Sequence, residues 1–175
     1  MPAGPDARED LARRLLAASE LRGDFVLSSG RRSRVYFDKF RFLTDPALLR
    51  ELARAVAGLL PEGCTHLAAP EGAAMLLVAA VALETGLPVA VVRKERKAYG
   101  TRALVEGRVE PGGAVALLED VSTTGHQVLR AARALEEEGA TVAVIVLAID
   151  RGGGEELRRA GYRVEAVATL DPGAS

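Results

Sequence analysis

Beyond residue 60, short apolar runs alternate with longer stretches in which apolar positions recur every three to four residues. The short runs lack polar alternation, which is typical of strands covered on both faces, and the longer stretches are typical of helices. The predicted strands span residues 66–69, 89–92, 114–118, 142–149 and 164–168. The predicted helices span residues 72–84 and 123–138, with a short one inside the glycine-rich stretch 152–161. Strands that alternate with helices form a mostly parallel sheet with right-handed crossovers, so the pattern predicts an α/β fold with helices flanking a central sheet.

The first sixty residues follow a different pattern. Apolar positions at helical spacing predict a helix over residues 6–21. Two apolar segments, 25–27 and 35–37, flank a polar stretch with a glycine and predict a β-hairpin. A second helix should begin at Asp45-Pro46 and run to about residue 60, because Asp caps helices and Pro fits their first turn.

The domain organisation follows from these elements and from the chain length. The helix and hairpin within about residues 1–40 are expected to form a small hood over one end of the sheet. Residues 93–107 are predicted to be a polar loop. We expect residues 1–175 to form one domain, since this length supports one core and no linker interrupts the chain.

Composition excludes several classes of protein. The 23 Lys and Arg residues balance 24 Asp and Glu, so the net charge of −1 provides no global basic field for nucleic acid. The longest apolar stretch, residues 73–83, is too short to span a bilayer, so no membrane partner is expected. Cys64 is the only cysteine, which predicts a small packing residue in a reducing, cytoplasmic setting. With His66 and His126 at these spacings, it builds no metal site of protein ligands.

Candidate chemistry concentrates between residues 115 and 127. An apolar strand ends in Glu119 and Asp120, which should point into the crevice where open α/β sheets bind ligands. The following loop, 122–127, offers hydroxyls, backbone N–H groups and a helix N-terminus, which suit a phosphate. A ribose diol, alone or with Mg²⁺, would separate the two acids from that phosphate. The segment therefore predicts a sugar-phosphate site, although paired acids and a Thr-Thr-Gly sequence also occur as a solvated turn and a helix cap.

Three other segments carry possible chemistry. Residues 93–102 hold five cations directly after a strand. This run of charge is typical of a solvated face, or of a loop that closes on a polyphosphate. Phe25, Tyr36 and Phe37 could wall a flat ligand or form the core of the hairpin. Arg151 follows a strand and precedes three glycines, which fits an ordinary turn or a guanidinium that binds a planar anion.

Four segments resemble a known family, in that family's order along the chain. Residues 118–125, LEDVSTTG, resemble the 5-phosphoribosyl pyrophosphate (PRPP) motif of the type I phosphoribosyltransferases. Residues 93–100, RKERKAYG, followed by VEG at 105–107, resemble the catalytic loop of the orotate phosphoribosyltransferases. The hairpin segment 25–33, FVLSSGRRS, and the segment 149–154, IDRGGG, are similar to that family's orotate-facing elements.

The resemblance implies a type I phosphoribosyltransferase-like fold and the transfer of a 5-phosphoribosyl group from PRPP to orotate, giving orotidine 5′-monophosphate and pyrophosphate in pyrimidine biosynthesis. The implied catalytic residues are Lys94, Lys97, Glu119 and Asp120. The implied PRPP-binding residues are Arg93, Lys94, Lys97, Tyr99, Glu119, Asp120, Val121, Ser122, Thr123, Thr124, Gly125, His126 and Gln127. The implied orotate-binding residues are Tyr36, Phe37, Thr123 and Arg151.

Mg²⁺ is the implied cofactor, carried by PRPP without direct protein ligands and reached by Glu119 and Asp120 only through water. The family also implies a homodimer in which the catalytic loop is shared across subunits. Three positions depart from the family pattern: Ser28 stands where some members have Lys, Tyr99 where His is common, and Glu71 lies in an atypical pyrophosphate-facing loop. Glu71 should either turn away from the pyrophosphate or bind it through Mg²⁺.

Two alternatives remain open. One is a phosphoribosyltransferase that acts on another base, as in purine salvage. The other is a non-catalytic, PRPP-binding regulator.

Overall fold

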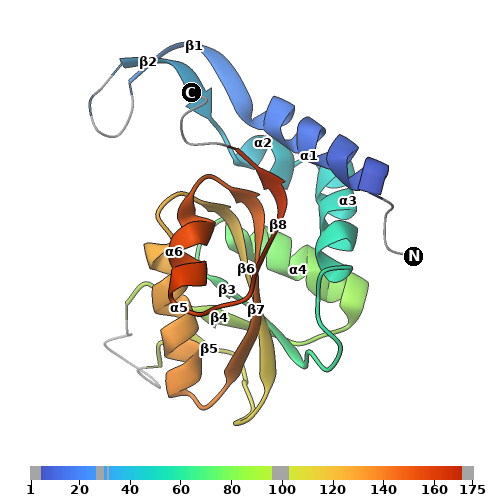
Figure 1. Ribbon diagram of the computed structural model, residues 1–175, viewed down its shortest axis with the longest axis vertical. Helices are drawn as coiled ribbons and strands as arrows, with labels where there is room; N and C mark the ends of the chain where they lie inside the picture. The colour runs from blue at the N-terminus through green and yellow to red at the C-terminus, as the bar shows by residue number, and fades with distance from the viewer. Residues whose placement is uncertain (1–4, 27–29, 31, 96–102, 171–175) are drawn as a thin grey trace.

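The centre of the molecule is a six-stranded sheet with helices on both faces, as the computed structural model shows for residues 5–26, 30, 32–95 and 103–170 (Figure 1). The strand order is β5-β4-β3-β6-β7-β8. The strands are β3 (His66–Pro70), β4 (Val89–Val92), β5 (Val105–Glu106), β6 (Ala114–Ser122), β7 (Thr141–Asp150) and β8 (Val164–Thr169). All neighbours are parallel except β4 and β5, which are antiparallel. The predicted α/β fold with a mostly parallel sheet is confirmed.

Two apolar cores lie on the two faces of this sheet. One face packs against α1 (Pro5–Ser19), α3 (Pro46–Ala57) and α4 (Ala74–Thr85). The other packs against α5 (His126–Glu137) and α6 (Gly153–Arg159). The central strands β6 and β7 contribute buried side chains to both cores, which explains why their sequences are apolar without alternation. Within the described ranges, no helix has the length and apolarity needed to cross a membrane.

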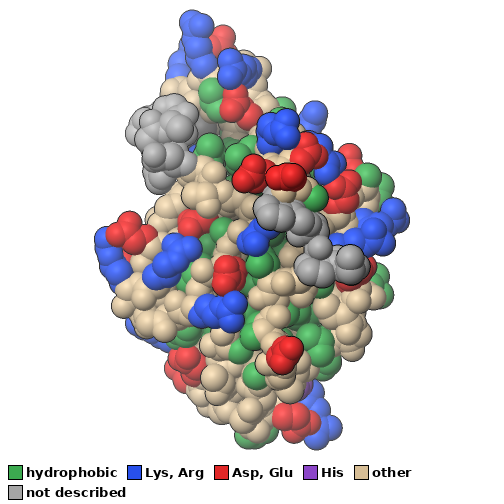
Figure 2. Space-filling model, turned by 45° about the vertical axis from the view of Figure 1, so that its right-hand side comes forward, with side chains coloured by type: hydrophobic (Ala, Val, Ile, Leu, Met, Phe, Trp, Pro, Cys, Tyr) green, Lys and Arg blue, Asp and Glu red, His purple; other side chains and the backbone are tan. Residues whose placement is uncertain are grey.

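A small hood of α1, a β-hairpin and a short helix lies at one end of the sheet (Figure 1). The hairpin pairs β1 (Glu20–Val26) with β2 (Arg32–Phe37), and α2 (Phe40–Leu43) follows at once. Phe42 and Leu43 of α2 are buried in the core that α1, α3 and α4 form on one face of the sheet. Helix α2 therefore connects the hairpin to the main sheet through apolar packing. Acidic and basic side chains are interspersed over the face shown in Figure 2, including its hairpin end.

Most predicted elements occur near their predicted positions, and three differences concern the site. Strand β6 continues to Ser122, so Glu119 and Asp120 are strand residues rather than the first loop residues. Helix α5 begins at His126 instead of residue 123, because Gly125 adopts a left-handed conformation with φ of 77°. The sequence patterns missed α2 and the two-residue strand β5, which are too short to show a period.

The second predicted helix begins as expected. Asp45 Oδ1 accepts hydrogen bonds from Ala47 N at 2.9 Å and Leu48 N at 3.0 Å, and Pro46 occupies the first turn. The helix ends at Ala57, three residues before the predicted position. Its cap fixes where α3 starts, directly after the hood.

Candidate functional site

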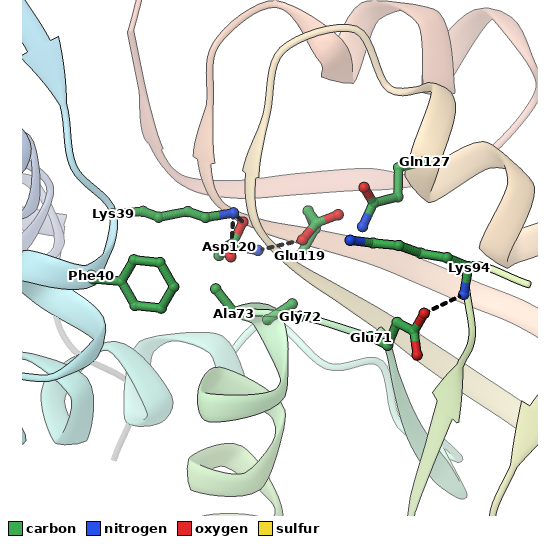
Figure 3. Close-up of a pocket in the computed structure, with 10 residues that line it drawn as sticks. Lys39, Phe40, Glu71, Gly72, Ala73, Lys94, Glu119, Asp120 and Gln127 are labelled. Atoms are coloured by element: carbon green, nitrogen blue, oxygen red, sulfur yellow. Dashed lines mark hydrogen bonds and ion pairs between the residues drawn. The ribbon is translucent and has the colours of Figure 1, made fainter. Parts of the chain in front are cut away.

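The candidate residues meet at one edge of the sheet, because parallel strands end at the same edge. Glu71 follows β3, Arg93 and Lys94 follow β4, and Arg151 follows β7, while Glu119 and Asp120 lie near the end of β6. A pocket opens between these strand ends and the hood (Figure 3). Its lining residues are Lys39, Phe40, Glu71, Gly72, Ala73, Ala74, Lys94, Glu119, Asp120 and Gln127.

The two acids form the floor of the pocket and are almost inaccessible, with Glu119 5% and Asp120 1% exposed. Asp120 Oδ1 accepts a hydrogen bond from Val121 N at 2.5 Å, and Glu119 Oε1 accepts one from Asp120 N at 3.1 Å. Burial, followed by the adjacent charge of Asp120, raises the pKa of Glu119 to about 8. At neutral pH Glu119 can therefore donate a hydrogen bond as well as accept one, which suits the hydroxyls of a diol.

Lys39 is a site residue that the sequence patterns missed. Its Nζ lies 3.1 Å from Asp120 Oδ1 with hydrogen-bond geometry, and 3.0 Å from Oδ2 as a charge contact. The lysine comes from the hood and the aspartate from the sheet, so the ion pair spans the pocket (Figure 3). Its signal in the sequence is weak, a cation two residues after the aromatic strand of the hairpin, and the contact itself depends on how the hood docks.

The predicted phosphate loop forms the connection from β6 to α5. The first intrahelical bond of α5 runs from Leu129 N to Gly125 O at 2.8 Å, and N–H groups before such a bond have no acceptor inside a helix. The side chains of Thr123, Thr124, His126 and Gln127 are exposed at this helix start. It therefore has the donors that a phosphate dianion needs.

Two residues of the same motif face inward. The Ser122 hydroxyl is buried against Gly153, where an added Cβ would lie 2.1 Å from Oγ. Val121 packs against the apolar core. Both can offer a ligand only their backbone groups.

Arg151 and Phe37, two predicted orotate-binding residues, lie together. The guanidinium carbon of Arg151 lies 4.5 Å from the centroid of the Phe37 ring. Arg151 N also donates to Ser122 O at 2.8 Å, one residue beyond the pair that Ser122 forms with Asp150 in the parallel strands β6 and β7. The pairing of β6 with β7 thus holds Arg151 beside the phosphate loop.

Tyr36 lies on the other face of the hairpin from Phe37, because neighbouring strand residues point in opposite directions. Tyr36 is 42% exposed, and its ring packs on Phe25 at a centroid distance of 5.5 Å. The structure therefore does not bring Tyr36 together with Phe37 and Arg151.

The cationic loop is described only at its ends. Lys97 and Tyr99 lie outside the described residues. Lys94 extends across the pocket toward Glu119 and Gln127 (Figure 3). Glu71 turns toward the start of this loop, where its carboxylate accepts a hydrogen bond from Lys94 N at 2.8 Å.

The residues present fit Mg²⁺ that arrives with a polyphosphate. The described residues contain no group of three or more His, Cys, Asp or Glu side chains that could hold a metal. The acid pair offers carboxylate oxygens, and Mg²⁺ in proteins commonly keeps its waters and uses one or two carboxylates together with substrate phosphates. Glu119 and Asp120 are the residues that would face the ion, through water.

Comparison with known proteins identifies the family. The model of the Phosphoribosyl transferase domain matches residues 41–168. The chain therefore belongs to the phosphoribosyltransferases. The orotate phosphoribosyltransferase of Methanopyrus kandleri is 44% identical over 167 residues, which cover 94% of this chain and 90% of that protein. Within the family, the chain belongs with the orotate phosphoribosyltransferases, as the resemblance of its motifs indicated.

Solved structures agree with this placement. The crystal structure of orotate phosphoribosyltransferase from Aeropyrum pernix matches with a TM-score of 0.74 and 38% identity, over 91% of this chain and 93% of that one. The orotate phosphoribosyltransferase of Mycobacterium tuberculosis in complex with PRPP matches with a TM-score of 0.76 and 27% identity, over 94% and 96% of the two chains.

Proposed function

We propose that the protein transfers the 5-phosphoribosyl group of PRPP to orotate. The bond from the anomeric carbon to pyrophosphate breaks, and a bond from that carbon to a ring nitrogen of orotate forms. The products are orotidine 5′-monophosphate and pyrophosphate. The observation that carries the proposal is the shared edge of β6 and β7, where Arg151 and Phe37 stand beside the acid pair and the phosphate loop.

The sugar phosphate is assigned to the β6–α5 segment. Glu119 and Asp120 hold the ribose hydroxyls, and the N–H groups at the start of α5 hold the 5-phosphate, with Thr123 and Thr124 beside them. Lys39 offsets the charge of Asp120, so the anionic substrate meets less repulsion from the pocket floor. Positioning of the two substrates accounts for much of the rate in this scheme.

Orotate is assigned to the space beside Arg151. A guanidinium matches a planar ring that bears carbonyl and carboxylate oxygens, and the Phe37 ring holds that guanidinium in place. Arg93, Lys94 and Lys97 are assigned to the departing pyrophosphate, where fixed positive charge stabilises the charge that develops. Mg²⁺ bound with PRPP would supply further charge stabilisation at the pyrophosphate.

The assembly we propose is a homodimer. One face of α4 carries Leu76, Ala79, Ala80 and Leu83 at helical spacing. Leu83 is 90% and Leu76 41% exposed, although such apolar stripes are usually covered. Burial of this stripe against a second copy supports a dimer, and we propose that the catalytic loop is shared across it. The cytoplasm remains our proposal for its location, on the argument from Cys64.

A base-specificity assay tests the function. Purified protein with PRPP and Mg²⁺ should consume orotate, as followed by the loss of its ultraviolet absorbance, and leave adenine, guanine and xanthine unchanged. Turnover of a purine without turnover of orotate would assign the site to another base. PRPP binding by calorimetry without product from any base would instead indicate a regulator.

A further inference from the structure

Glu71 contacts the beginning of the cationic loop through both its backbone and its side chain. Glu71 N donates to Val92 O at 2.8 Å, which extends the pairing of β3 with β4 by one residue. Its Oε1 accepts the hydrogen bond from Lys94 N at 2.8 Å. Its Oε2 lies 3.8 Å from Arg93 Nη1. Three consecutive residues, 92 to 94, are thus attached to this one residue.

The opposite side of the same segment is also fixed. Arg93 N donates to Leu104 O at 2.8 Å, and Val92 pairs with Val105 in the short β4–β5 ladder. Leu104 and strand β5 therefore hold residues 92 and 93. At Lys94 the backbone N–H has Glu71 as its partner, so Glu71 holds the Lys94 peptide in place.

This anchor determines where the Lys94 side chain points. The backbone N–H of Lys94 faces Glu71, and its side chain extends across the pocket toward Glu119 and Gln127 (Figure 3). A rotation of this peptide unit would break the hydrogen bond and swing the ammonium away from the pocket. The nearby Arg93 guanidinium offsets the negative charge that Glu71 brings to a polyphosphate site.

We propose that Glu71 is a positioning residue that holds the Lys94 backbone so that the Lys94 ammonium reaches the pyrophosphate of PRPP. The inference rests on the proposed function for the identity of that group. The hydrogen bond carries the effect, and the charge of Glu71 is secondary. Glu71 therefore acts through Lys94 and touches neither the sugar nor the base.

Two substitutions separate the hydrogen bond from the charge. Glu71→Gln keeps an oxygen that can accept from Lys94 N, whereas Glu71→Ala removes the acceptor. We expect Glu71→Ala to lower kcat about tenfold, the factor that corresponds to one hydrogen bond of ordinary strength, with the KM for orotate unchanged. Glu71→Gln should retain most of the turnover. Glu110→Gln, at the other edge of the sheet, is the matched control and should behave as the wild type.

Hydrogen exchange of the Lys94 amide provides a readout that does not depend on catalysis. Protection should be lost in Glu71→Ala and kept in Glu71→Gln. The inference is overturned if Glu71→Ala keeps either wild-type turnover or wild-type protection, or if Glu71→Gln loses as much turnover as Glu71→Ala. If the wild type forms no orotidine 5′-monophosphate, the proposed function fails, and Lys94 amide protection alone then decides whether Glu71 is the anchor.

Discussion

Glu119 and Asp120 are chemically similar neighbours in different surroundings. Asp120 has the Lys39 ammonium at 3.0 Å, whereas burial and the charge of Asp120 raise the pKa of Glu119 to about 8. One residue thus has a cationic partner, whereas the surroundings of the other favour its protonated form. A pair of this kind can bind both hydroxyls of a diol with complementary donors and acceptors.

This difference predicts how stability depends on pH. The pKa of Glu119 rises from an ordinary 4.5 to about 8 on folding, so between these values the folded chain binds more protons than the unfolded chain. The free energy of unfolding should then fall as pH rises through this window, by up to about 1.4 kcal/mol per pH unit from this group. Glu119→Gln should remove that contribution. Urea unfolding of both proteins from pH 5 to pH 9 measures it.

The matched control for this experiment is Glu62→Gln, which changes an exposed glutamate far from the pocket. Its stability should follow the wild type at every pH. Parallel curves for the wild type and Glu119→Gln would mean that Glu119 is ionised in the folded protein.

At the scale of elements, the turn from β7 into α6 determines the position of Arg151. Asp150 Oδ1 accepts hydrogen bonds from Gly152 N and Gly154 N, each at 3.0 Å, which closes the turn around residue 151. The turn requires glycine where the carboxylate approaches, because a Cβ on Gly154 would lie 2.1 Å from Asp150 Oδ2. The glycines after Arg151 are therefore a packing requirement of the site.

Gly154→Ala should displace the Asp150 carboxylate and, with it, Arg151. We expect a loss of about 1–3 kcal/mol in the free energy of unfolding, as for other overpacked positions. The KM for orotate should rise more than the KM for PRPP, since Arg151 is assigned to the base. Gly58→Ala is the control, because Gly58 is exposed and has an ordinary φ of −70°. Equal changes in both KM values would show that the turn does not act through Arg151.

The sequence predicted the sheet, the main helices and the strand ends at which the candidate residues meet, because these follow from local periodicity and from the rule for parallel sheets. It did not predict the partner of Asp120, since Lys39 reaches the acid only when the hood docks on the sheet. It also grouped Tyr36 with Phe37, although strand alternation alone separates them. Glu71 was recognised as unusual, but its contact with Lys94 depends on the exact pairing of β3 with β4.

At the scale of the whole molecule, the unexplained surface is the apolar stripe on α4. It begins near the pocket, because α4 follows Gly72 and Ala73 of the lining. A second copy seated there would lie close to the candidate site. This position is compatible with a catalytic loop that is shared between subunits.

Leu83→Lys tests the proposed dimer. The substitution places a cation in the last turn of α4, a position where a helix accepts positive charge. The same position lies on the apolar stripe, and burying a charge there would destabilise a dimer interface. In size-exclusion chromatography with light scattering, the wild type should have the mass of a dimer. The mass of Leu83→Lys should shift toward that of the monomer, and its turnover should be lower. Ala160→Lys, exposed on the opposite side of the sheet, is the control and should stay dimeric. A monomeric wild type at assay concentration would contradict the proposal.

The residues that the sheet contributes to the assigned site lie at the carboxyl ends of its strands, with Phe37 and Lys39 of the hood beside them. The other ends of the strands are left for a different purpose. The turns at residues 61–65, 86–88 and 111–113 lead into strands β3, β4 and β6 and contain none of the assigned residues. The turn at 111–113 is closed by Gly112 N donating to Gly139 O and by Gly113 N donating to Glu110 O, both at 2.8 Å. The turn at 86–88 is held by Gly86 N donating to Ala82 O and by Leu67 N donating to Pro88 O, and Leu87 packs against the core. A short peptide tag or fluorophore is therefore better placed at the exposed Glu62 and Gly63 of the first turn, where it would report on the enzyme from a distance without entering the substrate pocket.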